Sequence, residues 1–345
     1  MRPPIAARGT CRRPGQRMPR AIRAPSIVVV MMANRFLSQQ DRHQPQTAAI
    51  SPWTVAFLRW AARTLTKMED HTATGISARP TPVLRQYVDS YVGFDLRGLP
   101  TGVHCGPPSR ALTAVISLSG PLEVAAGVDD GSPVTRFGSV AGGLRCRSVA
   151  IHHDGRQRGV QLSLTPLGAR AIYGMPAAEL AHRLVPLDEL LGALAVELVD
   201  RLRSATTWAA RFTALDELLL RAVGRAACGD RVHWVRPEVA EAWRRLVAAR
   251  GCVQVGAVAE ELGWSRRYLT ERFRREVGLS PKTFARVLRF DHAHELAVAQ
   301  EPLPWGDVAT VSGYADQAHL VRDWREFTGR SPTAWRRGEV LLGAG

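Results

Sequence analysis

An internal repeat between residues 253 and 337 limits the possible folds of this chain more than any other feature. The first copy reads VAEELGWSRRYLTERFRREVGLSPKTF from Val258, and the second reads VATVSGYADQAHLVRDWREFTGRSPTAW from Val308. The copies are 50 residues apart up to their first glycine and 51 apart at Ser280 and Ser331, so the second copy has one extra residue in between. A repeat of this detail predicts two copies of one small structural unit.

Each copy has the pattern of a helix-turn-helix. A short helix with a small alanine is followed by a glycine that can make a sharp turn. An amphipathic helix comes next, then a glycine where a C-cap is expected and a Ser-Pro pair that suits the start of another helix. In the first copy the alanine is Ala259, the turn glycine Gly263, the apolar pair Leu269 and Phe273, and the C-cap glycine Gly278. In the second copy the corresponding residues are Ala309, Gly313, Leu320 and Trp324, and Gly329.

On these residues, the region Pro237–Arg337 resembles the DNA-binding domain of the AraC/XylS family of bacterial transcription regulators. The resemblance implies seven helices, with two helix-turn-helix units bridged by a long helix that matches Pro281 to Ala299. Two positions depart from the family pattern. Trp305 stands where an aliphatic residue is usual, and Val311-Ser312 stands where a pair of small residues is more typical. Further matching residues are Arg289, Ala293, Leu296, Gly313-Tyr314, Asp316-Gln317, His319-Leu320, Thr328-Gly329 and Ser331-Pro332.

The resemblance implies that the second helix of each unit enters the major groove of double-stranded DNA. The matching base-reading positions are Arg267, Thr270, Glu271, Gln317, Ala318, Val321 and Arg322, and the arginines better placed for phosphates are Arg266, Arg274, Arg275 and Arg325. Arginine suits guanine, glutamine suits adenine and glutamate can accept from cytosine, whereas Ala318 and Val321 can contact only thymine methyls. Glu271 has a second interpretation, as an ion-pair partner of Arg267 or Arg275 at helical spacing.

Net charge is weak support for DNA binding, because most of it lies elsewhere. The chain has 46 Lys and Arg against 31 Asp and Glu, and residues 1–70 alone hold 12 against 3. This basic N-terminal segment, rich in Arg, Pro and Gln, is typical of a disordered tail. Met68 precedes a more ordinary sequence, so we expect that translation can start there and that residues 1–67 need not be native.

The middle of the chain predicts a second domain of different type. Short β-rich runs separated by Gly and Pro favour a small antiparallel sandwich or barrel with a helical appendage, so the expected fold class is α+β. The predicted domains are 80–225 for effector sensing or dimerisation, 226–236 for a linker and 237–338 for DNA binding, with a tail at 339–345. The expected strands are Leu112–Leu118, Leu122–Ala126, Phe137–Val140, Ser148–His152 and Gly159–Leu164, and the expected helices are Leu84–Val92, Gly168–Tyr173, Leu187–Leu202 and Trp208–Val223.

Three readings of the middle domain stay open. The favoured one is a module for an unknown small-molecule effector, without a cofactor or a metal. In the second, His104-Cys105, Cys146 and His152-His153 form a metal or thiol sensor, although ordinary structural residues are the simpler explanation. In the third, the domain is an enzyme, but the sequence contains no GxSxG, HExxH or phosphate-loop motif, so we expect no catalysis.

Cysteine usage and hydropathy bear on location and partners. The five cysteines, Cys11, Cys105, Cys146, Cys228 and Cys252, never form a CxxC pair, which suits reduced thiols in the cytoplasm. The apolar run Ile27 to Ala33 is shorter than a typical signal-peptide core, and no run approaches a membrane span. Besides DNA and the effector, RNA polymerase and a second copy of the chain are the expected partners, and no membrane is.

Overall fold

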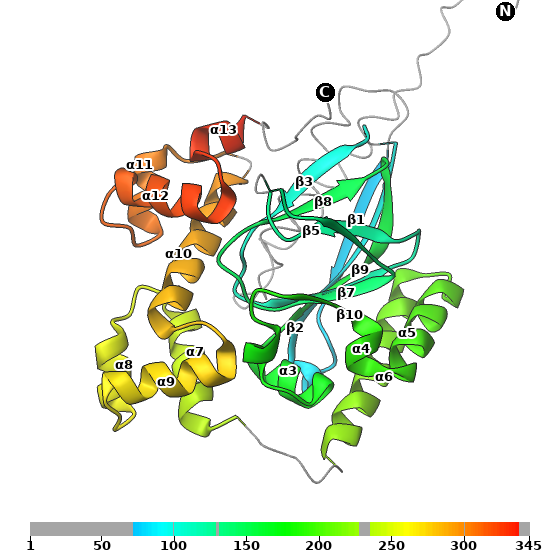
Figure 1. Cartoon of the computed structure of the whole chain (residues 1–345), viewed down its shortest axis with the longest axis horizontal. Coiled ribbons are helices and arrows are strands. Elements are labelled where there is room, and N and C mark those ends of the chain that lie inside the picture. Colours follow the sequence, from blue (N-terminus) through cyan, green and yellow to red (C-terminus); the bar gives the residue numbers. More distant parts are fainter. Residues whose placement is uncertain (1–71, 99, 129–130, 228–234, 300, 338–345) are drawn as a thin grey trace, which may run out of the picture.

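The structure, a computed structural model, describes residues 72–98, 100–128, 131–227, 235–299 and 301–337 (Figure 1). A β-rich N-terminal part with a helical appendage is followed by an all-helical C-terminal part, so the fold is α+β as the sequence predicted. The predicted tails 1–70 and 339–345, the run Ile27 to Ala33, Cys11 and Cys228 lie outside the described residues, as does most of the predicted linker. None of the described helices is long and apolar enough to cross a membrane.

Two antiparallel sheets form the N-terminal part. One has six strands in the order β1-β2-β9-β4-β7-β10, and the other has four in the order β3-β8-β5-β6. The strands are β1 Thr72–Ala78, β2 Val88–Arg97, β3 Gly102–Gly106, β4 Leu112–Ser117, β5 Leu122–Ala125, β6 Val134–Phe137, β7 Ser139–Gly142, β8 Val149–His153, β9 Arg156–Leu164 and β10 Leu184–Pro186.

Side chains of the two sheets meet in a small apolar cluster that is separate from the main core. Leu122 and Val124 of β5 and Val149 of β8 pack there against Val140 of β7, which belongs to the other sheet. This facing of the sheets makes the domain a sandwich, as expected from its many short strands. The main core lies on the other side of the six-stranded sheet and continues into the helices.

The helical appendage packs on the six-stranded sheet. Its elements are η1 Pro82–Leu84, α3 Pro166–Tyr173, η2 Ala177–Leu180, α4 Leu187–Leu191, α5 Ala193–Ser204 and α6 Trp208–Ala227. Thr165 caps α3 by accepting a hydrogen bond from the Gly168 amide, and Gly174 ends that helix at φ +73.

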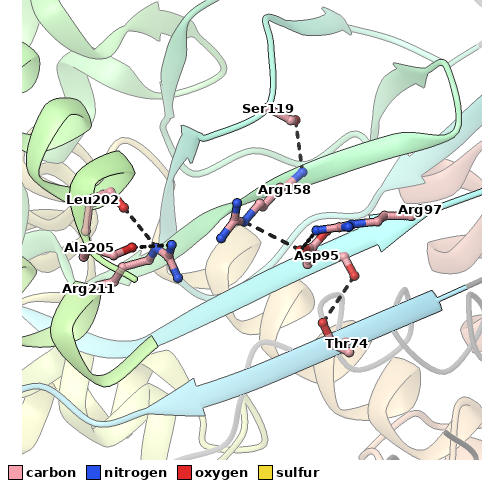
Figure 2. A network of polar contacts seen from close by, with 8 residues as sticks. All are labelled: Thr74, Asp95, Arg97, Ser119, Arg158, Leu202, Ala205 and Arg211. Atoms are coloured by element: carbon pink, nitrogen blue, oxygen red, sulfur yellow. Dashed lines mark hydrogen bonds and ion pairs between the residues drawn. The ribbon is translucent and has the colours of Figure 1, made fainter. Parts of the chain in front are cut away.

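A buried arginine joins the last two helices of the appendage (Figure 2). Arg211 of α6 donates to the carbonyl oxygens of Leu202 at 2.9 Å and Ala205 at 2.5 Å, at the C-terminal end of α5. These carbonyls lack helical partners, so the guanidinium satisfies them. Nearby on the sheet, Arg158 of β9 forms an ion pair with Asp95 of β2. The Arg211 guanidinium therefore joins the start of α6 to the end of α5.

Seven helices make up the described C-terminal part, the number that the resemblance implied. They are α7 Pro237–Ala248, α8 Val255–Glu261, α9 Arg266–Val277, α10 Pro281–Ala297, α11 Trp305–Val311, α12 Gln317–Thr328 and α13 Pro332–Arg336. In Figure 1, α10 runs between a group formed by α7, α8 and α9 and a group formed by α11, α12 and α13. It is therefore the predicted bridge, ending at Ala297 rather than Ala299.

Several predicted elements in the N-terminal part are wrong. The expected helix Leu84–Val92 is a turn of 3-10 helix followed by strand β2, because β2 pairs with strands on both sides and this pairing overrides a helix-like spacing of apolar residues. The expected strand Phe137–Val140 is two strands in different sheets, separated by Gly138. The expected helix Leu187–Leu202 breaks at Gly192, where φ is +56. No element had been predicted over β1, β3 or β10.

Candidate nucleic-acid interface

Helix α9 is defined at both ends by local signals in the sequence. The Ser265 hydroxyl accepts a hydrogen bond from the Tyr268 amide, which caps the start of the helix. Gly278 ends it with a φ of +92, a backbone conformation that glycine adopts without strain. Leu269 and Phe273 are fully buried on one face. The helix therefore presents its other face outward.

The outward face of α9 carries the predicted DNA-contacting residues of the first unit. Arg266, Arg267, Glu271, Arg274 and Arg275 are exposed, and Thr270 is half-buried. The Thr270 hydroxyl donates to the carbonyl of Arg266 within the same helix. Glu271 forms an ion pair of 2.7 Å with Arg275, one of the two partners considered for it. This pairing holds Glu271 beside a cation when no DNA is bound.

Helix α12 repeats this construction in the second unit. Asp316 caps it by accepting from the His319 amide at 2.6 Å, and Gly329 ends it at φ +76. The helix starts four residues after Gly313, whereas α9 starts three residues after Gly263, which is the extra residue seen in the repeat. The predicted contact residues Gln317, Ala318, Arg322 and Arg325 are exposed, and Val321 is half-buried.

The two turn glycines have the same backbone conformation but different surroundings. Gly263 and Gly313 have φ values of +69 and +75. A Cβ at Gly313 would lie 2.3 Å from Sγ of Cys252, whereas a Cβ at Gly263 would meet nothing. Arg289 of α10 lies beside Gly313 and also donates to the carbonyl of Gly251 at 2.8 Å. The turn of the second unit is thus packed against the start of the first.

Aromatic side chains attach each recognition helix to α10. In the first unit, Phe284 of α10 stacks on Trp243, which also lies next to Phe273 of α9. In the second unit, the rings of Phe290 and His294 of α10 lie beside Trp324 of α12. A shared bridge with apolar contacts on both sides keeps the two helices in a fixed relation.

The second unit contains two further side chains that local sequence did not explain. Trp305, the departure from the family pattern, lies against Trp324 and beneath the Arg336 guanidinium at 3.7 Å. Burial lowers the pKa of His294 to about 3, so this ring is neutral at pH 7. Both side chains belong to the aromatic core of the unit rather than to its outer face.

An arginine of the bridge also pairs with the carboxylates of α12. The Arg286 guanidinium lies 2.8 Å from Asp323 and 2.5 Å from Glu326, and these hydrogen bonds raise the pKa of Arg286. Asp323 is buried, so the pair fixes the rotation of α12 about its own axis. Arg286 and Asp323 are 37 residues apart, so no local pattern in the sequence predicted this contact.

The N-terminal domain contacts the C-terminal ends of both recognition helices, which the sequence did not predict. Arg170 of α3 pairs in two-pronged fashion with Glu276 of α9, at 2.5 and 2.7 Å. Beside it, a Cβ at Gly278 would lie 2.5 Å from the Cβ of Ala181. At the other unit, the amide and hydroxyl of Ser148 donate to the carbonyl of Phe327 at 2.8 and 2.9 Å.

One of these contacts extends to the predicted base-reading face of α9. Ala178 of η2 lines the same hollow as Arg267, Thr270, Glu271 and Arg274. The N-terminal domain therefore lies next to the surface that the first unit would offer to DNA.

The candidate sensor residues are only partly brought together. The rings of His104 and His153, on paired strands β3 and β8, are 5.4 Å apart, and burial lowers the pKa of each. Cys146 lies instead near Arg286 and Glu326 of the C-terminal part, and burial raises the pKa of its thiol. Among the described residues, no three His, Cys, Asp or Glu side chains form a group that could hold a metal ion.

A model of a helix-turn-helix domain matches residues 258–338, the segment that holds both units and the bridge. Residues 258–338 are a helix-turn-helix domain of the AraC type. The chain is 26% identical over 85 residues to uncharacterized HTH-type transcriptional regulators of Staphylococcus aureus, among them those of strains MSSA476 and MRSA252. Each match covers 24% of this chain and 11% of the relative, so the chain aligns with a small part of these proteins.

The chain is also similar to several solved structures. ToxT from Vibrio cholerae has 10% identity and a TM-score of 0.43, covering 80% of this chain and 100% of that one. The C-terminal domain of AraT from Geobacillus stearothermophilus has 25% identity and a TM-score of 0.29, covering 32% and 93%. The AraC-like transcriptional activator CuxR has 13% identity and a TM-score of 0.30, covering 67% and 88%.

Proposed function

We propose that this chain is a transcription regulator that binds a specific, asymmetric DNA site through α9 and α12. The observation that carries the proposal is the pair of capped helices with exposed polar faces, α9 and α12, attached to one bridge helix, α10. Two recognition helices in one polypeptide suit two successive major grooves, about one helical turn apart. We expect the protein to act in the cytoplasm, without catalysis.

The roles of the side chains follow from their chemistry and position. Arg267 has a planar fork of donors that matches guanine O6 and N7, and Gln317 matches adenine. Thr270, Glu271, Ala318, Val321 and Arg322 complete the proposed base-reading set. Arg266, Arg274, Arg275 and Arg325 would contact phosphates, which position the protein without reading sequence.

Control by the N-terminal domain is the second part of the proposal. This domain contacts the end of each recognition helix, through the ion pair Arg170–Glu276 at α9 and the hydrogen bonds of Ser148 to Phe327 at α12. A small molecule that changes the N-terminal domain would thereby change how α9 and α12 meet DNA. RNA polymerase and a second copy of the chain are further proposed partners.

The experiment that tests DNA recognition starts from the purified full-length chain. Selection from a random DNA pool, followed by footprinting, should give one asymmetric site with protection in two successive major grooves. Enrichment of no sequence, or of a symmetric half-site bound by a single unit, would contradict the proposal.

Two variants then separate base reading from phosphate contact. Arg267→Ala should cost about 1–3 kcal/mol of binding at one base pair, while Arg274→Ala should weaken all sequences alike and reduce the salt slope by about one. Binding measured on the selected site, on single-base variants and over a range of salt concentrations distinguishes them. If both variants change only the salt slope, the proposed direct reading by Arg267 is wrong.

A further inference from the structure

A cavity of about 100 Å³ lies between the two sheets of the N-terminal domain. Both sheets contribute apolar walls, among them Val115 and Val140 from one sheet and Val124 and Ile151 from the other. The small apolar cluster between the sheets surrounds it and is separate from the main core. A sandwich normally fills this space with side chains, so the cavity is available to a ligand.

One arginine gives this apolar space a positive charge. Among the residues that line the cavity, Arg145 is the one that carries a full charge at pH 7, and no carboxylate lines it. The hydrogen bonds of Arg145 go to two backbone carbonyls, those of Gly143 and Arg183, at 3.4 and 3.3 Å. Burial lowers the pKa of Arg145 to about 10, which still leaves it protonated.

The position of the guanidinium is set by a glycine. A Cβ at Gly142 would lie 2.5 Å from Nη2 of Arg145. Gly142 is two residues after Val140 on β7, so its missing side chain would point to the same face, toward the cavity. The guanidinium therefore occupies the space over Gly142, at the cavity wall.

A second polar side chain in the wall lacks a partner. Gln161 of β9 is 2% exposed, and its Oε1 has no hydrogen bond in the described part of the chain. A buried amide without a partner costs free energy, and a ligand or water in the cavity could supply the missing bond. Gln161 is opposite Val115 in the sheet, and Gly142 is opposite Thr113, two residues away, so both polar groups serve one cavity.

We propose that this cavity binds a short-chain carboxylate, with the anionic group at Arg145 and the hydrocarbon body between the sheets. A guanidinium binds a carboxylate through two parallel hydrogen bonds, and the low dielectric of the apolar walls strengthens them. An engineered cavity of about 150 Å³ accommodates benzene, so the present volume fits a hydrocarbon body of no more than about six carbons. Binding of a carboxylate in this cavity does not depend on the proposed function; only the inference that the ligand regulates DNA binding rests on it.

The cavity is connected to the DNA-binding domain through two loops. Arg145 is three residues before Ser148, which holds the end of α12 through Phe327. Ser109 and Ala111 in the cavity wall flank Arg110. Burial raises the pKa of Asp291 and Glu295 on α10, and the nearby charge of Arg110 partly offsets this rise. A ligand that draws Arg145 inward would displace the same segment that contacts the second unit.

Calorimetric titration of the full-length chain with pentanoate, with 1-pentanol as the uncharged counterpart, tests the proposal. Pentanoate should bind and 1-pentanol should bind at least about tenfold more weakly, since a hydrogen bond to a charged group is lost. Arg145→Met should weaken pentanoate at least about tenfold, and Gly142→Ala should weaken it too by displacing the guanidinium. Arg147→Met, an exposed neighbour outside the cavity, is the matched control and should bind like the parent.

Pentanoate and 1-pentanol are compared on the parent protein. The proposal can therefore still be refuted if Arg145→Met fails to fold. Absence of pentanoate binding, or equal binding of 1-pentanol, would overturn it. Equal affinity of the parent and Arg145→Met would also overturn it. Footprinting of the same preparation without ligand reports on DNA binding separately, so loss of this inference would leave the proposed function standing.

Discussion

The two helix-turn-helix units have the same local construction but differ in surface charge and in core. The outward face of α9 carries four of the predicted contact arginines, Arg266, Arg267, Arg274 and Arg275, whereas that of α12 carries Arg322 and Arg325 beside Gln317 and Ala318. The core of the second unit is the more aromatic, with Trp305, Trp324 and Trp335 in contact. We infer that the first unit supplies more of the DNA affinity and specificity and that the second fixes the register.

The attachment of the units to the rest of the molecule differs as well. The first is held by a side-chain ion pair, Arg170–Glu276, and the second by hydrogen bonds to a backbone carbonyl, from Ser148 to Phe327. An ion pair depends on two side chains and responds to salt, whereas a backbone contact depends on the position of the chain. The first unit should therefore be easier to release.

The largest expected effect is on stability. Trp324→Ala should lower the free energy of unfolding by about 3–5 kcal/mol, because a fully buried ring is replaced by a cavity. Phe273→Ala should lower the free energy of unfolding by less, because its ring is smaller and contacts fewer aromatic side chains than Trp324 does. Urea denaturation measures both, with exposed Val311→Ala as the control. A larger loss for Phe273→Ala would reverse our view of the two cores.

The next effect concerns base preference. Gln317→Ala should relax the preference at its base pair by about 1 kcal/mol, at the lower end of the range of about 1–3 kcal/mol expected for Arg267→Ala. The reason is that a neutral amide makes weaker hydrogen bonds than a guanidinium. Competition binding with single-base variants of the selected site measures both. If Gln317→Ala has the larger effect, the second unit is the main reader.

A pH effect should be specific to the core of the second unit. The folded pKa of His294 is lowered to about 3 from an ordinary value of 6.5, so the unfolded chain takes up the proton first as the pH falls. The contribution of neutral His294 to the free energy of unfolding is complete above pH 6.5 and decreases below it. Between pH 7 and pH 5.5 the free energy of unfolding should fall by about 1 kcal/mol. His294→Leu should remove this loss in urea denaturation at the two pH values.

The difference between the parent and His294→Leu isolates this group from a neighbour of opposite sign. Burial raises the pKa of Asp291 on the same helix to about 7, so its unfavourable ionised form disappears as the pH falls, in both proteins alike. An unchanged pH dependence in His294→Leu would show that His294 does not titrate with unfolding.

The smallest expected effect is on release of the first unit. Arg170→Met should tighten DNA binding by about threefold, because a partly exposed ion pair contributes about 1 kcal/mol or less. Exposed Arg203→Met on α5 is the control. Binding measured at low and high salt should show the gain shrinking as salt rises. Weaker DNA binding by Arg170→Met would mean that the contact orients α9 for DNA rather than restraining it.

Local signals in the sequence predicted the helical domain well. The caps at Ser280 and Ser331, the helix ends at Gly278 and Gly329 and the extra residue in the second turn are all present in the structure. Each depends on residues within a few positions of one another, so the sequence could be read directly. The assignment of individual side chains to bases or phosphates stays a prediction.

The strands were harder to predict because their partners are far away in the chain. β2 pairs with β9 some 70 residues later, from Val88 with Leu164 to Arg97 with Arg156, and this pairing decided against the expected helix. The expected strand at residues 137–140 spans a crossing between sheets that local composition does not mark. Strand preference depends on cross-strand neighbours, which a single sequence does not reveal.

The sequence by itself determined a duplicated helix-turn-helix, since turns and caps are encoded by neighbouring residues. Only the tertiary structure brought Arg170 to Glu276 and Ser148 to Phe327, over separations of 106 and 179 residues. It also placed the Arg145 guanidinium over Gly142 at the wall of an apolar cavity. Such contacts arise from the packing of whole sheets and helices, because burial brings together side chains whose spacing in the chain carries no signal.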